Sequence, residues 1–139
     1  MKILVPVDGS AYSLKAVETA CDLIKSQPPS SLVLVSVGIQ VPELEEGQYI
    51  AEKMKALAEK ALDQAKAQAQ EKGVTPEVLL ATGVSPADEI VKVAKDVKAD
   101  LIVIGSRGLA GKTRFFLGST ASTVVTYSPC SVLVVKTPE

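Results

Sequence analysis

The sequence predicts an α/β fold, with a five-stranded parallel sheet in the order 3-2-1-4-5 and helices on both faces. Runs of apolar β-forming residues alternate five times with segments of helical periodicity. These runs are mostly continuous rather than alternating, which is typical of parallel strands buried on both faces. Right-handed crossovers between such strands place helices on both faces of the sheet. The length of 139 residues suits a single domain, residues 1–139.

The first strand and the first helix are predicted at the start of the chain. Lys2–Val7 is a nearly continuous apolar run, and either Asp8 or Ser10 can cap the helix that follows. This helix stops at Pro28-Pro29, and its apolar face consists of Leu14, Val17, Cys21 and Ile24. We interpret Cys21 as a small buried hydrophobe, and the two cysteines suggest no disulfide framework.

The second strand leads to the longest helix. Leu32–Val37 is again a continuous apolar run, and Ile39–Gly47 is expected to be a solvated loop. The helix is predicted over Gln48–Lys72, with Gly73 as its C-terminal stop. Its inner stripe is predicted from helical spacing to be Ile50, Met54, Leu57, Ala61, Leu62, Ala65 and Ala69.

A short strand, a capped helix and a terminal strand are predicted in the second half. The short strand is predicted over Val78–Ala81. Pro76 precedes it and Glu77 stands at its start, which suits an edge strand. The sequence Ser85-Pro86-Ala87-Asp88 is a helix-capping signal with proline at the first helical position. The helix behind it has the apolar face Ile90, Val93, Ala94 and Val97. Pro129 breaks the last helix, and Val132–Val135 is the last strand.

Between these elements lies a glycine-rich connection that is the best candidate for a binding site. The apolar strand Leu101–Ile104 runs into a loop that contains Gly105, Gly108, Gly111 and Gly118. A helix then begins near Ser119-Thr120, with Ala121, Val124 and Val125 on one side. Helix starts present unpaired N–H groups, and glycines let an anion approach them closely. Positive charge is added by Arg107, Lys112 and Arg114, so the loop suits a phosphate group. The alternative is an ordinary strand-to-helix loop that needs glycines for its turns.

The spacing of the glycines excludes two common phosphate motifs. The Walker pattern G-x-x-x-x-G-K-[ST] fails because its first glycine would fall on Ser106. The dinucleotide pattern G-x-G-x-x-G is absent. The pattern G-x-x-G-x(9)-G-[ST] is complete over Gly105, Gly108 and Gly118-Ser119. It resembles the ATP-binding signature of the universal stress protein family.

A second segment supports this resemblance independently. Ile3–Ser10, followed by Ser13, Ala16 and Ala20, is similar to the family's opening I-L-V-x-V-D-G-S-x-x-S-x-x-A-x-x-x-A. The chain departs from the family at Pro129-Cys130-Ser131, where members often have Cys-Pro-Val. Arg107 also stands where members often have histidine or another polar residue.

The resemblance implies a Rossmann-like fold of the adenine nucleotide alpha hydrolase type that binds ATP, with a Mg or Mn ion held through the phosphates. The end of the first strand would line the nucleoside, the backbone near Val37 would meet the adenine edge, and the glycine loop would hold the phosphates. For Asp8, a role as helix cap alone remains the alternative. The implied binding residues are Pro6, Val7, Asp8, Val37, Ile104, Gly105, Arg107, Gly108, Gly118, Ser119, Thr120 and Ala121.

The resemblance further implies a stress- or energy-responsive regulator that forms a homodimer through Val132 and Val134 and acts on an unidentified protein partner. A slow ATP hydrolase and a nucleotide-free dimeric scaffold remain alternatives. We predict no catalytic residue and no protein metal ligand. The chain has no histidine, which removes Ser-His and Cys-His nucleophile pairs and histidine metal sites. The net charge of −1 gives no broad reason to expect nucleic acid or anionic membranes as partners. The apolar start is too short for a signal peptide or a membrane span, so a cytoplasmic protein is expected.

Overall fold

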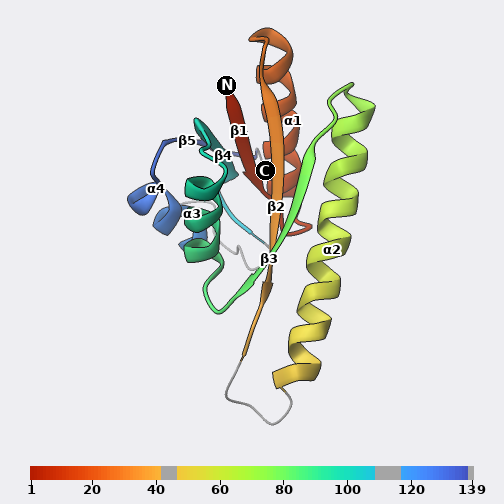
Figure 1. Cartoon of the computed structure of the whole chain (residues 1–139), viewed down its shortest axis with the longest axis vertical. Helices are drawn as coiled ribbons and strands as arrows, with labels where there is room; N and C mark the ends of the chain where they lie inside the picture. The colour runs from red at the N-terminus through yellow and green to blue at the C-terminus, as the bar shows by residue number, and fades with distance from the viewer. Residues whose placement is uncertain (42–46, 109–116, 138–139) are drawn as a thin grey trace.

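The computed structural model describes residues 1–41, 47–108 and 117–137. Strands and helices alternate along the chain (Figure 1). The predicted elements are all present, with small shifts at their ends. In chain order they are β1 (Lys2–Pro6), α1 (Ala11–Ser26), β2 (Ser31–Ile39), α2 (Gly47–Glu71), β3 (Glu77–Gly83), α3 (Pro86–Asp96), β4 (Leu101–Gly105), α4 (Ser119–Tyr127) and β5 (Ser131–Val135).

The strands form one five-stranded sheet in the order β3-β2-β1-β4-β5, and every pair is parallel. The predicted order is therefore confirmed, with β3 at one edge and β5 at the other. The chain moves outward from β1 to β2 and β3, and then crosses to β4 on the other side of β1. In such sheets a ligand crevice lies beyond the carboxyl ends of the two strands where this reversal occurs.

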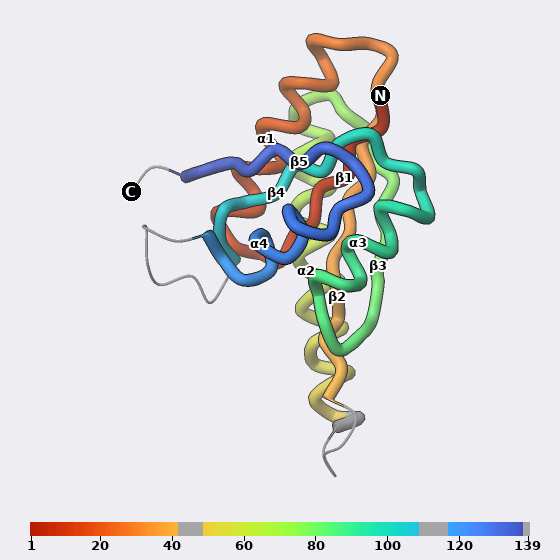
Figure 2. Tube along the Cα trace, turned by 90° about the vertical axis from the view of Figure 1, so that its left-hand side faces the viewer, coloured from red at the N-terminus to blue at the C-terminus, as the bar shows by residue number. Residues whose placement is uncertain are grey.

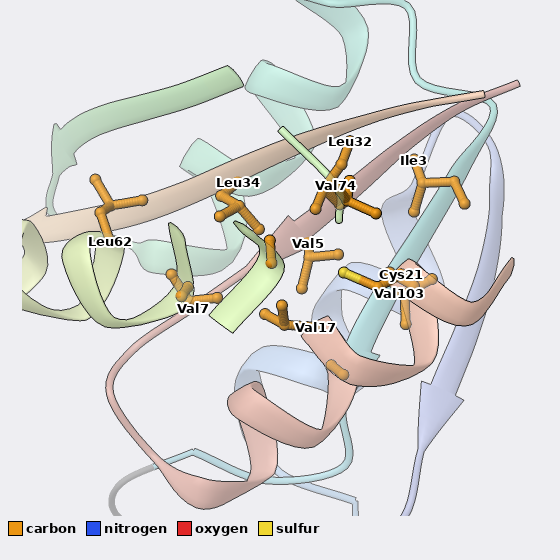
Figure 3. Close-up of a cluster of buried hydrophobic side chains, with 14 of the residues drawn as sticks. Ile3, Val5, Val7, Val17, Cys21, Leu32, Leu34, Leu62, Val74 and Val103 are labelled. Atoms are coloured by element: carbon orange, nitrogen blue, oxygen red, sulfur yellow. The ribbon is translucent and has the colours of Figure 1, made fainter. Parts of the chain in front are cut away.

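Helices α1 and α2 cover one face of the sheet, and α3 and α4 cover the other (Figure 1). Figure 3 shows the core on the α1/α2 side, where Cys21 and Val17 of α1 lie against Val5 and Val103 of the sheet. Because successive strand residues point to opposite faces, Leu34 belongs to this cluster, whereas its neighbours Val33 and Val35 belong to the other. Both faces of the central strands are thus buried, as the continuous apolar runs predicted.

The helix α2 and the strand β2, which stays paired with β3 to Ile39, extend beyond the end of β1 (Figures 1 and 2). Leu57 lies in this part of α2 and is 50% exposed, so its assignment to the buried stripe was wrong. The periodicity of the stripe is correct, but strand β1 has already ended at this level of the sheet. On α4, Val125 is 45% exposed while Ala121 and Val124 are buried, so that apolar side is narrower than predicted. Within the described ranges, no helix combines the length and the apolar character needed to cross a membrane.

Candidate functional site

A cavity of about 390 Å³ lies beyond the carboxyl ends of β1, β2 and β4, which is where the strand order reverses. The first halves of α2, α3 and α4 complete its wall. Its described walls combine a polar region around Asp8 and the glycines with an apolar region. The apolar region consists largely of Val35, Val37, Ile39, Met54, Leu57, Ala58, Pro86 and Ile90.

The turn that follows β1 fixes the position of Asp8. The N–H of Ser10 donates to Asp8 Oδ1 at 2.9 Å, and the N–H of Asp8 donates to Ser13 Oγ at 3.3 Å. Gly9 between them has φ +86°, a conformation that residues with a Cβ rarely adopt. Ser10, rather than Asp8, caps α1, since its Oγ accepts from Ser13 N at 3.2 Å. Asp8 is therefore not the helix cap, and its carboxylate lines the cavity.

Strand β1 ends before its neighbour β2, which exposes part of the backbone of β2 to the cavity. The pairing of the two strands ends at Pro6 with Val35, and Val7 N then donates to Val35 O at 2.8 Å. The amide and carbonyl groups of a strand alternate in direction, so those of Val37 point to the same side as those of Val35. Beyond the end of β1 that side is the cavity, which Val37 lines.

Glycines allow the end of β4 and its loop to approach the end of β1 closely. A Cβ at Gly105 would lie 2.8 Å from the carbonyl oxygen of Tyr12, in the first turn of α1. A Cβ at Gly108 would lie 2.6 Å from Asp8 Oδ2. Both distances are shorter than real Cβ contacts. The glycine at position 108 thus leaves the space that the Asp8 carboxylate occupies.

The third glycine brings the start of α4 back to the same loop. Gly118 N donates to Ser106 O at 2.7 Å. A Cβ at Gly118 would lie 3.2 Å from both Arg107 Cα and Ser106 O. Gly118 is also the N-cap of α4, and no side chain within the described ranges caps this helix end by a hydrogen bond. The first N–H groups of α4 and the positive end of its dipole therefore begin at the cavity wall.

All of the residues predicted to bind a ligand line this one cavity, from Pro6, Val7 and Asp8 through Val37 and the glycine loop to Ala121. Their binding of a nucleotide stays a prediction. Gly111, Lys112 and Arg114, which we expected to add to the phosphate site, lie outside the described residues. Among the described lining residues, the two that carry charge are Asp8 and Arg107.

Several lining residues were not predicted from the sequence, most of them on β2, α2 and α3. Met54, Leu57 and Ile90 were interpreted only as core positions, and no spacing pattern distinguishes a cavity wall from a core. Ser36 carried a usable signal, because it is the one polar residue within the continuous run Leu32–Val37. The lining residues not predicted are Ser13, Val35, Ser36, Ile39, Met54, Leu57, Ala58, Pro86 and Ile90.

The cavity suits a ligand with a flat apolar part and an anionic part. Glycine backbone, the start of α4 and the hydroxyls of Ser119 and Thr120 can donate to anionic oxygens. The apolar walls can cover a ring system. The described residues contain no cluster of three or more His, Cys, Asp or Glu side chains that could hold a metal ion.

Fold and cavity together define a doubly wound α/β protein with a cavity at the reversal of its strand order. A family model described as the universal stress protein family matches residues 1–136. The chain belongs to the universal stress protein family.

Three known proteins illustrate the similarity. A universal stress protein of Methanocaldococcus jannaschii is 38% identical over 142 residues, covering 99% of this chain and 83% of the relative. The solved structure of the universal stress protein UspA from Lactobacillus plantarum matches with a TM-score of 0.84 and 27% identity, over 97% of each chain. A universal stress protein solved in complex with cAMP matches with a TM-score of 0.77 and 30% identity, over 99% of this chain and 98% of that one.

Proposed function

We propose that this protein binds an adenine nucleotide, ATP together with a Mg or Mn ion, and acts as a stress- or energy-responsive regulator. One observation carries the proposal. Asp8, Gly105, Gly108 and Gly118 line the same cavity, and this cavity also has an apolar region. The similar universal stress protein solved in complex with cAMP supports an adenine nucleotide as the ligand class.

In the proposed complex the adenine ring lies in the apolar region, between the α2 and α3 sides of the cavity. The backbone groups of Val37 meet its edge, and the end of β1 with Asp8 lies beside the ribose. The phosphates lie against Gly105, Gly108 and the start of α4, where N–H groups and the helix dipole favour negative charge. The cation is held by phosphate oxygens and water, because Mg²⁺ in proteins usually keeps several waters.

Isothermal titration of nucleotide-stripped protein with ATP, ADP and AMP tests this proposal. We expect heat of binding and a rise in thermal stability, since a ligand that binds only the native state stabilises it. Gly118→Asp should abolish binding, because it places a carboxylate beside the start of α4. Gln70→Glu, on the exposed surface of α2, adds the same charge away from the cavity and should bind normally. Absence of heat and of stabilisation at millimolar ATP would refute the proposal.

We further propose that the protein is a homodimer joined through β5. This strand is an edge of the sheet, and an edge strand offers unpaired backbone groups to a second strand. Val132 and Val134 are partly buried against the α3/α4 side of the core, whereas Leu133 on the opposite face of β5 is 38% exposed. A two-fold axis at this edge would pair each β5 with its own copy.

A further inference from the structure

Ser36 is a polar residue in the buried part of β2, and it lines the cavity. Its side chain is only 3% exposed, and its hydroxyl donates to the carbonyl oxygen of Val7 at 2.6 Å. Val7 lies just beyond the last β1 residue that pairs with β2. The two residues thus meet where the end of β1 opens the cavity.

The bond to Val7 limits what the Ser36 hydroxyl can offer a ligand. A hydroxyl has one proton to donate and two lone pairs that accept. The Ser36 hydroxyl uses its proton in the hydrogen bond to Val7 O. Within the described ranges no group donates to Ser36 Oγ. The hydroxyl can therefore accept a hydrogen bond from a ligand, but it cannot donate one without breaking the bond at 2.6 Å.

A second buried serine of the cavity wall has one free acceptor position fewer. Ser13 is 5% exposed, and its Oγ donates to Ser10 O at 3.0 Å and accepts from Asp8 N at 3.3 Å. Both its proton and a lone pair are thus used within the turn that fixes Asp8. Ser13 therefore serves as a matched comparison, since it lines the same cavity and is similarly buried.

We propose that Ser36 is a specificity-determining residue that selects a ligand with an N–H donor, so that the site prefers adenine over purines with a carbonyl oxygen in place of its exocyclic amino group. This rests on the proposed function, in which a purine lies in the apolar region beside β2. The exocyclic amino group of adenine can donate to Ser36 Oγ. The carbonyl oxygen of hypoxanthine would place lone pair against lone pair, which leaves a buried acceptor unpaired.

The competing explanation is that Ser36 is purely structural and only satisfies Val7 O at the end of the sheet. The two roles differ in their dependence on the ligand. A structural defect weakens every nucleotide alike, whereas loss of the contact weakens only a nucleotide that has the amino group. ATP, purine riboside triphosphate, which lacks that group, and inosine triphosphate are suitable probes.

The experiment measures the affinities of the three nucleotides for the wild type, Ser36→Ala, Ser36→Thr and Ser13→Ala by isothermal titration. In Ser36→Ala, the preference for ATP over purine riboside triphosphate should fall by about three- to tenfold, the value of one neutral hydrogen bond. Ser36→Thr keeps the hydroxyl and should keep the preference. Ser13→Ala should leave the ratio of affinities unchanged even if it weakens both ligands.

Two results overturn the inference while leaving nucleotide binding intact. One is a wild type that binds ATP and purine riboside triphosphate equally well, a result that requires no variant to fold. The other is an equal loss for both ligands in Ser36→Ala. Binding of none of the three nucleotides by the wild type would instead refute the proposed function, and the selectivity with it.

Discussion

The approach of β4 to the first turn of α1 can be tested with Gly105→Ala. Gly105 is buried, and its new Cβ would lie 2.8 Å from Tyr12 O and 2.9 Å from Tyr12 C. These are backbone atoms of a helix start, so they cannot rotate away as a side chain can. Either the end of β4 or the start of α1 must move, and both lie at the cavity.

The expected magnitude follows from two opposing effects. Overpacking of a well-packed region costs about 1–3 kcal/mol, and replacing glycine by alanine restores about 0.4–1 kcal/mol through the unfolded state. We therefore expect a net loss of about 1–2 kcal/mol in the free energy of unfolding. For a chain of this size, that corresponds to a fall in Tm of roughly 3–10 °C.

Gly83→Ala is the matched control, because Gly83 is also the last residue of a strand. A Cβ there would lie 2.6 Å from Glu89 Cγ, which belongs to a flexible side chain that can turn away. This variant should be neutral or stabilised by up to about 1 kcal/mol. Chemical denaturation monitored by circular dichroism measures both variants. Equal stability of Gly105→Ala and Gly83→Ala would show that the close approach at β4 is not a packing constraint.

Three further outcomes are expected. Leu133→Lys should shift dimers toward monomers in light scattering, because it adds a positive charge to the exposed face of β5 in both subunits; a monomeric wild type would contradict the proposed dimer. ATP turnover should lie far below about one per second, because the chain has no histidine and Asp8 lies on the nucleoside side of the proposed site. Faster ATP turnover that is abolished by Asp8→Asn would refute this expectation. Burial raises the pKa of the Cys21 thiol, so the free energy of unfolding should fall as the pH rises above the ordinary thiol value of about 8.5. Cys21→Ala should make this fall less steep and Cys130→Ser should not; equal slopes in the two variants would contradict the assignment.

The fold could be predicted because its determinants are local and periodic. Continuous apolar runs such as Leu32–Val37 indicated strands buried on both faces, and Gly73, at φ +81°, ends α2 as its position suggested. Burial at the ends of elements could not be predicted in the same way. Helical spacing places Leu57 on the inner side of α2, but it does not tell where β1 stops in the sheet beneath that helix.

The polar region of the candidate site was predicted better than its apolar region, for a physical reason. Close backbone approach requires glycine, so Gly105, Gly108 and Gly118 leave a spacing that can be recognised in the sequence. An apolar wall imposes no such requirement. Met54 and Ile90 have the same residue type and spacing whether they face a core or a cavity, so only the three-dimensional arrangement distinguishes the two.

The position at which β1 ends connects these observations. Pro6 is paired with Val35, and β2 continues alone beside β3 to Ile39. If β1 continued, its backbone would fill the space beside Val37. The carbonyl of Val7 would then no longer lie at a strand end, where the Ser36 hydroxyl donates to it. Instead, β1 ends and the chain turns at Gly9. This turn places Asp8 at the opening beside β2. The cavity is therefore a consequence of unequal strand lengths.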